Sequence, residues 1–412
     1  MGKISYRLFI FFYRVFISFA ALFNKKAKLF SQGRKNLFQE LSDDFKAHSG
    51  ELAWFHCASL GEFEQGRPVI EAFKQEFPHF KILLTFFSPS GYEVRKDYAL
   101  ADYVYYLPLD TPKNARNLIN ITKPSIAIFV KYEYWYFYLK ALKKNNIPIL
   151  SVSSIFRKDQ IYFKKHGSFY RHILKQVSHF FVQDYPSKEL LNKISFSNVT
   201  VSGDTRFDRV VSIVNNKKEI PNIKEFKDKD QLMVIGSCWP EDFEVLVSFI
   251  NEFPIKFIIA PHEIEEKFMQ RIEKDAIKKV IRFSKLTQAT AKEHDILIID
   301  NVGMLSKLYA YADYAYIGGA FGAGLHNILE AATFGLPIFF GNKNYTKFKE
   351  AVDLINLGGA VAIADNNQLR FQFHQFMDER TYNIGSQVNR DYVIDHKGAT
   401  DKIINHCKEI LS

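Results

Sequence analysis

The feature that most constrains the fold of this chain is a repeated alternation of short apolar runs with longer helical stretches. In the first half the apolar runs are 52–57, 81–87, 103–109, 125–130, 147–153, 179–183 and 198–203. In the second half they are 232–237, 256–261, 279–284, 295–300, 313–319, 337–341 and 360–364. Apolar runs of this length, separated by helices, predict parallel strands that are buried on both faces, and hence an α/β fold.

The chain length and one charged interruption predict two such domains. A chain of 412 residues is longer than one core usually supports. Residues 216–230, NKKEIPNIKEFKDKD, are charged, contain a proline and predict a linker. We therefore expect a membrane-associated helix and basic flank at 1–30, a doubly wound Rossmann-like domain at 31–215 and a second one at 231–412. Ligands of open parallel sheets bind beyond the carboxyl ends of the strands, so the expected site is the cleft between the two domains.

The positive charge of the chain is concentrated near its amino terminus. The net charge is +10, and the first 50 residues hold nine Lys and Arg against three acidic residues, a difference of six. A nucleic-acid-binding protein would present its charge as a stripe, so no nucleic-acid partner is expected. The three cysteines are Cys57, Cys238 and Cys407, and their spacing fits neither a disulfide framework nor a metal site, which favours a reducing compartment.

Residues 4–23, ISYRLFIFFYRVFISFAALF, are apolar except for Arg7 and Arg14, and NKKAK follows them. Two internal arginines argue against a spanning helix, and there is no clear signal-peptide cleavage site. The pattern favours a helix lying at or dipping into the bilayer, where the arginines reach the interface and the basic cluster meets anionic lipid. The alternative is an aromatic-rich core helix with two exposed arginines.

The stretch WFHCASLGEFEQGRP (54–68) places a carboxylate directly after the first strand. The turn 58–61 ends with Gly61, and Glu62 lies in the first turn of a helix that runs to about Phe77. Gly61 allows a ligand to approach closely, and the helix start favours an ionised Glu62 that can accept a proton. Acidic residues are also common in first turns for the helix dipole alone, so spacing does not decide between the two interpretations. Two other strand ends in this half offer Glu133, in KYEYW, and Arg206, in GDTRFD; an arginine there could hold an anion or be an ordinary surface residue.

The most distinctive stretch of the second half is GGAFGAGLHNILEAATFGLP (318–337). It predicts a glycine-rich loop followed by a helix that begins near His326 and Asn327, an arrangement that can bind an anion. The glycines do not follow the dinucleotide pattern G-x-G-x-x-G. Asn327 and Glu330 share a helix face, and the carboxylate could accept both hydroxyls of a ribose, which suits a nucleotide donor. A helix packed on glycines with a capping Asn is the alternative.

Smaller loops at the strand ends of the second half face the same expected cleft. They are IGSCWPED (235–242), APHE (260–263) with His262, and DNVGML (300–305). His262 is a candidate base or phosphate contact, although a lone histidine is more often structural. The D-x-D at 228–230 lies in the charged linker, zinc-ligand spacing is absent, and so is a G-x-S-x-G nucleophile elbow, so no metal site or cofactor is expected.

The motif S-L-G-E at 59–62, followed by G-G-x-F-x-x-G-x-H-N-x-L-E at 318–330, resembles the bacterial 3-deoxy-D-manno-octulosonic acid (Kdo) transferases of lipopolysaccharide synthesis. The resemblance covers nearly the whole chain. It implies the GT-B architecture, an inverting and metal-independent transfer of Kdo from CMP-Kdo to a lipid A precursor such as lipid IVA, and attachment to the cytoplasmic face of the inner membrane, whose anionic lipid is an expected partner.

The resemblance also implies roles for individual residues. The catalytic proton acceptor falls on Glu62, and two transition-state residues fall on Glu133 and Arg206, where the family usually has a lysine in place of Arg206. The nucleotide contacts fall on Pro261, His262, Val302, Gly303, Met304, Asn327, Ile328, Leu329 and Glu330. Gly61 is expected beside the acceptor.

Two other classes of function fit parts of the sequence. One is a GT-B enzyme that uses a UDP-sugar, either a transferase or an epimerase; the membrane-associated segment argues against the epimerase. The other is a non-enzymatic protein that binds a membrane surface, which the candidate groups in both halves disfavour.

Overall fold

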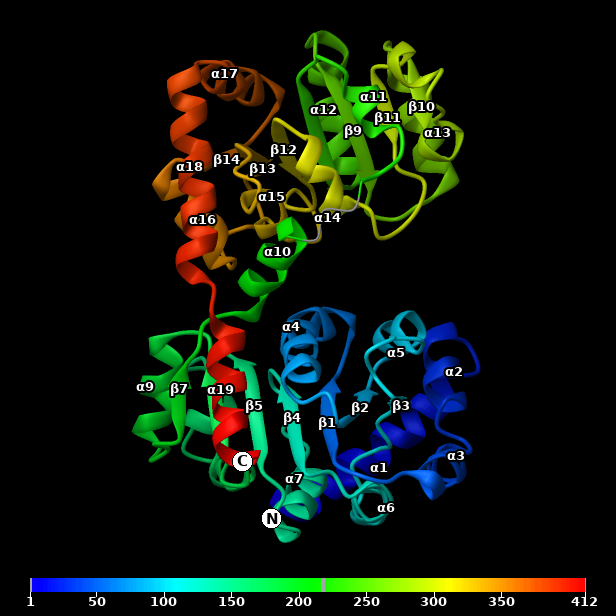
Figure 1. Cartoon of the computed structure of the whole chain (residues 1–412), viewed down its shortest axis with the longest axis vertical. Helices are drawn as coiled ribbons and strands as arrows, with labels where there is room; N and C mark the ends of the chain where they lie inside the picture. Colours follow the sequence, from blue (N-terminus) through cyan, green and yellow to red (C-terminus); the bar gives the residue numbers. More distant parts are fainter. Residues whose placement is uncertain (1, 216–218, 412) are drawn as a thin grey trace. The chain divides into compact units, whose positions relative to one another are not determined.

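The structure is a computed structural model that describes residues 2–215 and 219–411. It contains two compact units, one formed by Met1–Arg209 together with Lys397–Ser412 and the other by Val210–His396. Each unit is built on a parallel seven-stranded sheet flanked by helices (Figure 1). The α/β class and the two doubly wound domains predicted from the sequence are thus confirmed.

The first sheet has the strand order β3-β2-β1-β4-β5-β6-β7, and its paired strands are parallel. Its strands are β1 Leu52–Cys57, β2 Lys81–Phe86, β3 Tyr103–Tyr106, β4 Ile126–Val130, β5 Ile149–Ser154, β6 His179–Val182 and β7 Val199–Val201. The helices of this unit are α1 Gly2–Ala20, α2 Lys25–Gln32, α3 Leu37–Asp44, α4 Leu60–Glu76, α5 Pro89–Arg95, α6 Pro112–Thr122, α7 Tyr136–Lys144, α8 Ser168–Leu174, α9 Tyr185–Lys193 and α19 Ala399–Leu411.

The second sheet repeats this arrangement with the order β10-β11-β9-β8-β12-β13-β14, again parallel. Its strands are β8 Leu232–Cys238, β9 Lys256–Pro261, β10 Val280–Arg282, β11 Ile296–Ile298, β12 Tyr314–Ile317, β13 Ile338–Gly341 and β14 Ala360–Ile363. Helix α10 Thr205–Asn215 begins in the first unit, and α11 Ile223–Lys227, α12 Pro240–Glu252, α13 Glu266–Asp275, α14 Leu305–Leu308, α15 Leu329–Ala332, α16 Lys349–Leu357, α17 Asn366–Phe376 and α18 Glu379–His396 belong to the second.

Strand β1 shows why the apolar runs fold as central strands. All six of its residues are buried. Leu52 and Trp54 belong to a core that includes side chains of α3, α6 and α7, whereas Ala53, Phe55 and Cys57 belong to a core shared with α4 and α19. Successive side chains of a strand point to opposite faces, so a strand covered by helices on both sides is mostly apolar, and a polar residue such as His56 must be hydrogen-bonded there.

The domain boundaries differ from the predicted ones at the carboxyl terminus. Residues 397–412 were expected in the second domain, but α19 packs on α4 of the first unit, where Ile403 and Cys407 are buried (Figure 1). The apolar face of α19 covers part of a sheet face that would otherwise be exposed, and burial of that face is the physical reason the chain returns.

The segment 216–230, which was predicted to be a linker, is also different in the structure. Its residues 216–218 lie outside the described residues, and the remainder belongs to the second unit, where α11 buries Ile223 and Phe226. The charge of this segment predicted a linker, but Ile223 and Phe226 lie three positions apart on one face of α11 and pack into the second unit.

Helix α1 is packed on the first unit along one side only. Tyr6 donates a hydrogen bond to Asp110 (2.6 Å), and Ile10 is buried. The other sides expose Ile4, Leu8, Phe9, Phe11, Phe12, Val15, Phe16 and Phe19, each more than half accessible to solvent. The alternative of an ordinary core helix therefore does not describe α1.

Among residues 2–215 and 219–411, no helix is both long enough and apolar enough to cross a membrane.

The return of the chain into the first unit generates a stability prediction. Asp208 of α10 accepts hydrogen bonds from the backbone of Gly398 (2.6 Å) and from the backbone and hydroxyl of Thr400 (both 2.7 Å), and so caps α19. We expect Asp208→Ala to lower the free energy of unfolding by about 1–2 kcal/mol, the usual cost of losing a helix cap, in thermal or urea denaturation. Asp401→Ala, an exposed acid in the first turn of α19, is the matched control and should cost only a few tenths of a kcal/mol. Equal losses in both variants would contradict the capping role.

Candidate active site

Glu62 lies in the first turn of α4, directly beyond the carboxyl end of β1. Its Oε2 atom accepts a hydrogen bond from the backbone N–H of Ser59 (3.0 Å), which forms a capping box at the start of the helix. This hydrogen bond folds the carboxylate back over the start of the helix, and Glu62 is half-buried there. The glycine before it, Gly61, is exposed, and a side chain built there would meet no atom within 4 Å, so the space beside Glu62 is open.

The electrostatic environment of Glu62 corrects one sequence prediction. The helix start was expected to keep this carboxylate readily ionised, but burial raises its pKa above the usual value, and the charge of Glu133 raises it further. His56 and Lys131 act in the opposite direction but do not cancel the rise. A carboxylate with a raised pKa is a stronger base once it is ionised, so the correction brings Glu62 closer to what proton transfer needs.

Glu133 lies in the turn after β4 and is held by two neighbours. Its Oε2 atom accepts a hydrogen bond from the Trp135 indole N–H (2.7 Å) and lies 3.3 Å from His56 Nε2. The carboxylate side chain is 12% exposed, whereas the histidine is fully buried. A buried carboxylate is stable only when it is paired and hydrogen-bonded, and here a tryptophan and a histidine supply those partners.

His56 connects this pair to the interior of the sheet. Its Nδ1 atom lies 3.0 Å from the carbonyl oxygen of Thr85 and 2.9 Å from the Thr85 hydroxyl oxygen. The bond to Glu133 requires a proton on Nε2, so Nδ1 either accepts from the hydroxyl in a neutral ring or donates to the carbonyl in a charged one. In both states the ring is fixed, and Glu133 is fixed with it.

Arg206 is the second residue of α10, shortly after β7. Its backbone N–H and side-chain Nε donate to the carboxylate of Asp204 (2.9 and 2.8 Å). Lys131, which follows β4, is electrostatically coupled to Asp204, to Arg206 and to Glu62. Burial lowers the pKa of Lys131. The structure thus brings the three predicted residues Glu62, Glu133 and Arg206 to the same edge of the first sheet, with Lys131 among them.

Lys131 was not predicted from the sequence. Its φ angle is 63°, a left-handed conformation that is unusual for a residue other than glycine. Such conformations persist where the surrounding structure imposes them and are frequent at functional sites. The only signal in the sequence was its position directly after a buried strand.

In the second unit, three aromatic rings stack at the strand ends. The ring of His262, after β9, lies 4.3 Å from the Trp239 ring and 4.3 Å from the His326 ring, with interplanar angles of 19° and 27°. Trp239 Nε1 donates to His326 Nε2 (3.0 Å). Burial, assisted by His262, lowers the pKa of His326 to about 4, so this ring is neutral at neutral pH. We call these three rings the aromatic stack.

The sequence predicted only one member of this stack, His262. Trp239 and His326 are about 90 positions apart in the chain, and only the parallel order of β8, β9 and β12 brings them together. The sequence did contain a positional signal, because each of the three aromatic residues directly follows a strand or the glycine-rich loop.

Asp242 of α12 fixes the glycine-rich loop next to the aromatic stack. It accepts hydrogen bonds from the N–H of Gly319 (2.8 Å), the N–H of Trp239 (3.0 Å) and the hydroxyl of Tyr316 (2.9 Å). Gly319 has a φ angle of 95°, and a side chain there would lie 2.4 Å from the carbonyl oxygen of Gly324, so both conformation and space require glycine.

The predicted helix start near His326 is wrong, because the short helix α15 begins at Leu329 and has four residues. Asn327 therefore precedes the helix and does not share a helix face with Glu330, but the two side chains are still in contact: Asn327 Nδ2 donates to Glu330 Oε1 (3.1 Å). The Asn327 side-chain oxygen also accepts a hydrogen bond from the Leu329 N–H (3.3 Å). Ile328 and Leu329 are buried, so their side chains belong to the core and any ligand contact would come from the backbone.

The other predicted nucleotide contacts lie in loops. Pro261 ends β9, next to His262. Val302 is 86% exposed, Gly303 has a φ angle of 90°, and Met304 precedes α14. Within the part of the chain that the structure describes, no group of three or more His, Cys, Asp or Glu side chains is arranged to hold a metal ion.

The fold resembles that of solved sugar-nucleotide enzymes. UDP-GlcNAc 2-epimerase from Neisseria meningitidis, solved with bound UDP-GlcNAc, matches with a TM-score of 0.62 over 87% of this chain and 99% of that one, at 14% identity. Acinetobacter baumannii MurG matches with a TM-score of 0.54 over 87% of this chain and 100% of that one, at 13% identity. At such low identity the likeness establishes the fold alone, which is the GT-B arrangement of two Rossmann-like domains.

Comparison of the sequence with known proteins finds similar proteins of one kind. Residues 31–209 match the family model described as 3-deoxy-D-manno-octulosonic acid transferase (Kdo transferase). Proteins of that name from Chlamydophila psittaci and Rickettsia bellii are each 26% identical, covering 77% and 79% of this chain and 76% and 79% of their own lengths. A relative from Chlamydia muridarum is 28% identical over 71% of this chain and 70% of its own. The chain is therefore similar to Kdo transferases over most of its length.

The raised pKa of Glu62 generates a prediction about stability. The pKa in the folded state lies above that of an unfolded chain, so the ionised carboxylate costs folding energy, and this cost is present at high pH and absent below the unfolded pKa. We expect Glu62→Gln to raise the free energy of unfolding at pH 8 by roughly 0.5–2 kcal/mol, the usual size of stabilising substitutions, and the gain to shrink toward pH 4. Thermal denaturation between pH 4 and 8 measures it.

Glu64→Gln is the matched control on the same helix. Glu64 pairs with Arg95 (2.9 Å) and Arg209 (3.5 Å), so its neutralisation should lower stability at neutral pH. If Glu62→Gln were also destabilising at pH 8, the assigned electrostatic environment of Glu62 would be wrong.

Proposed function

We propose that this protein is an inverting glycosyltransferase that moves Kdo from CMP-Kdo to a lipid A precursor, such as lipid IVA, in lipopolysaccharide synthesis. The match of residues 31–209 to the Kdo transferase family model and the similarity to proteins named Kdo transferase support the transferase class and the sugar. The observation that carries the proposal is the half-buried Glu62, held at a helix start beside open space, with a pKa raised by burial and by Glu133.

In the proposed reaction, Glu62 acts as the general base. The acceptor hydroxyl oxygen attacks the anomeric carbon of Kdo from the face opposite the nucleotide, and its proton passes to the Glu62 carboxylate. The bond between the anomeric carbon and the phosphate oxygen breaks, and CMP leaves with that electron pair. The products are the Kdo-bearing acceptor, CMP and one proton on the carboxylate, which later returns to water.

The other polar groups of the first unit stabilise charge in this scheme. Glu133 keeps the pKa of Glu62 raised, and its own position is set by His56 and Trp135. Arg206 and Lys131 provide positive charge for the carboxylate of Kdo or the departing phosphate. Proton transfer and charge stabilisation by side chains account for each step of the scheme, which includes no metal.

The second unit supplies the donor site in this proposal. The aromatic stack offers flat ring faces on which a pyrimidine base can stack, and the Asn327–Glu330 pair offers acceptors for ribose hydroxyls. The His326 ring is neutral at neutral pH, and an uncharged ring is a suitable stacking partner for an uncharged pyrimidine ring. Pro261, the 302–304 loop and the backbone at 328–329 are further proposed contacts.

We place the protein at the cytoplasmic face of the inner membrane. The support is α1, whose outward sides expose eight large apolar residues between positions 4 and 19. A helix of this kind inserts its apolar side chains among lipid tails, and the lysines of α2 attract anionic headgroups.

The base assignment is tested by Glu62→Gln. This change keeps the size of the side chain and removes its basicity, so we expect Kdo transfer to fall by roughly 10²–10⁴-fold, the usual contribution of a general base. Binding of CMP, which we assign to the other unit, should be unchanged. Purified protein, CMP-Kdo and a lipid A precursor, with products counted by mass, provide the assay. The control is Glu71→Gln on the same helix; transfer at the wild-type rate by Glu62→Gln would refute the assignment.

The donor assignment is tested by Trp239→Ala. Loss of an aromatic stacking partner costs about 1–3 kcal/mol, so we expect CMP to bind roughly 5- to 150-fold more weakly in titration calorimetry. Phe371→Ala, an exposed aromatic of the same unit, should leave binding unchanged. A wild-type protein that preferred UMP or UDP over CMP would instead support a transferase or epimerase of UDP-sugars.

A further inference from the structure

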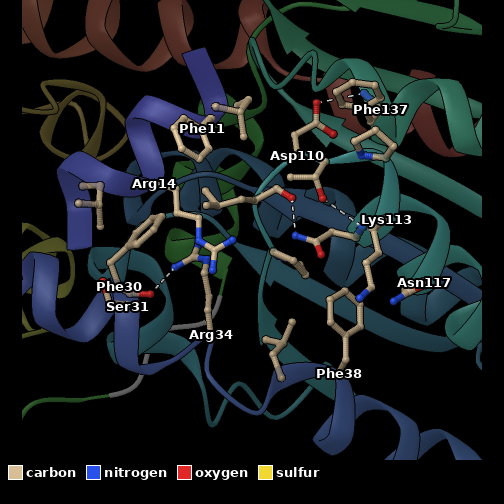
Figure 2. A pocket seen from close by; sticks show the side chains of 18 of the residues that line it. Phe11, Arg14, Phe30, Ser31, Arg34, Phe38, Asp110, Lys113, Asn117 and Phe137 are labelled. Carbon is tan, nitrogen blue, oxygen red and sulfur yellow. Dashed lines mark hydrogen bonds between the residues drawn. The ribbon is translucent and has the colours of Figure 1, made fainter. Parts of the chain in front are cut away.

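A pocket of about 880 Å³ lies between α1 and the body of the first unit, away from any residue assigned above to the reaction. Helices α1, α2, α3 and α6 and the loop after β3 line it, and its volume is within the range of about 300–1,000 Å³ typical of small-molecule sites. Figure 2 shows Phe11, Phe30, Phe38 and Phe137 on its walls, with Arg14, Arg34 and Lys113 among them.

The charge of this pocket is strongly positive and is not balanced by the protein. Five cationic side chains line it: Arg7, Arg14, Arg34, Lys35 and Lys113. One carboxylate, Asp110, also lines it, but its oxygens accept from the Tyr6 hydroxyl (2.6 Å) and from the N–H groups of Phe137 and Tyr138 (both 3.0 Å). Among the described residues, no carboxylate lies within ion-pair distance of these five cations. We call this site the basic pocket.

Arg34 shows that the positive charge is built into the structure. Its guanidinium donates to the carbonyl oxygens of Leu107 (2.9 Å), Phe30 (2.9 Å) and Phe87 (2.7 Å), and it lies 3.6 Å from the Phe30 ring centre. Burial lowers its pKa to about 10, which still leaves it charged at neutral pH. A half-buried cation that is fixed by neutral carbonyls and lacks a carboxylate favours an external anion.

Five neutral polar side chains line the basic pocket, and three of them are already hydrogen-bonded within the protein, which leaves Ser31 and Asn117 as neutral partners for a ligand. Asn114 donates its side-chain N–H to Leu109 O (2.8 Å), Thr111 Oγ accepts the Asn114 N–H (3.2 Å), and the Ser18 hydroxyl donates to Arg14 O (2.9 Å). Recognition of a sugar needs several free neutral groups to pair with its hydroxyls. Cations beside aromatic and aliphatic walls instead match a phosphate joined to a hydrocarbon chain.

The position of α1 shows where such a molecule would come from. This helix forms one wall of the basic pocket through Ile10, Phe11 and Ile17, while its other sides expose Phe12 (64%), Phe16 (66%) and Phe19 (63%). A helix that enters the headgroup region with those side chains brings the mouth of the pocket to the level of the lipid phosphates. The bilayer therefore supplies the amphiphile continuously.

We propose that the basic pocket binds one anionic phospholipid of the bilayer, with its phosphate between Arg14, Arg34 and Lys113 and an acyl chain against the aromatic walls. This is a specific site for a single lipid, in addition to the attachment of α1 to the membrane surface. The proposal does not depend on the reaction proposed above.

The test counts lipids retained by the purified full-length chain in native mass spectrometry. Delipidated protein in detergent is incubated with phosphatidylglycerol or with zwitterionic phosphatidylcholine. We expect one phosphatidylglycerol per chain and little phosphatidylcholine. In Arg14→Ala/Lys113→Ala, retention should fall by roughly tenfold or more through loss of two charged phosphate contacts.

Two further variants separate the basic pocket from general charge attraction. Lys143→Ala/Lys144→Ala removes the same charge from exposed positions in the last turn of α7, outside the pocket, and should retain phosphatidylglycerol as the wild type does. Ser31→Trp keeps every cation and fills the pocket, so it should lose the lipid. Thermal denaturation verifies that each variant is folded.

Three results would overturn the proposal. The first is an equal loss of lipid in the two double-alanine variants, which would show surface attraction only. The second is undiminished binding by folded Ser31→Trp. The third is displacement of phosphatidylglycerol by a stoichiometric amount of lipid A precursor, with the same dependence on Arg14 and Lys113, which would assign the pocket to the acceptor instead.

Discussion

The structure depends on two parallel sheets that are buried on both faces. A central strand such as β1, with six buried residues, is almost entirely apolar, and its one polar side chain, His56, is hydrogen-bonded to Thr85 and Glu133. The other polar groups of the site therefore come from residues that follow the strands. Glu62, Glu133 and Arg206 follow β1, β4 and β7, and the parallel direction of the strands brings these distant residues to one edge of the sheet. The aromatic stack arises in the same way from β8, β9 and β12 of the second sheet.

The two sheet edges nevertheless present opposite chemistry. In the first unit two carboxylates interact within range of His56 and Lys131, and their mutual repulsion together with burial raises the pKa of Glu62. In the second unit burial removes charge, so that His326 is a neutral ring stacked on its neighbours. One edge is thus arranged to take up a proton, and the other to accept a flat, uncharged group. This division matches a transferase whose acceptor and nucleotide are held by different domains.

Packed aromatic rings connect the basic pocket beneath α1 to the edge of the first sheet. Phe30, on the wall of the basic pocket, lies 5.2 Å from the Phe87 ring, and Phe87 lies 4.7 Å from the ring of Trp135, which donates a hydrogen bond to Glu133. Helix α1, the basic pocket and the sheet edge that carries Glu133 are therefore connected by packed side chains. The amino-terminal segment is consequently a structural component of the first unit and not a detachable tether.

The sequence by itself determined the architecture. Fourteen apolar runs predicted the fourteen strands of the two sheets, because a strand buried on both faces is mostly apolar along its length. It also indicated Glu62, because a glycine turn and a first-turn acid are local features. It could not give the direction in which the pKa of Glu62 is shifted, since that depends first on burial in the folded protein and then on Glu133, which is 71 residues away in the chain.

Only the tertiary structure decided the remaining features. The aromatic stack joins residues from three strands, and the return of α19 to the first unit depends on which sheet face needs cover. The basic pocket depends on which side of α1 packs inward, a choice that its nearly uniform apolar sequence leaves open. Sequence periodicity specifies which residues are buried, but the partners of a buried or half-buried charge are set by contacts between segments that are distant in the chain, and those contacts exist only in the folded protein.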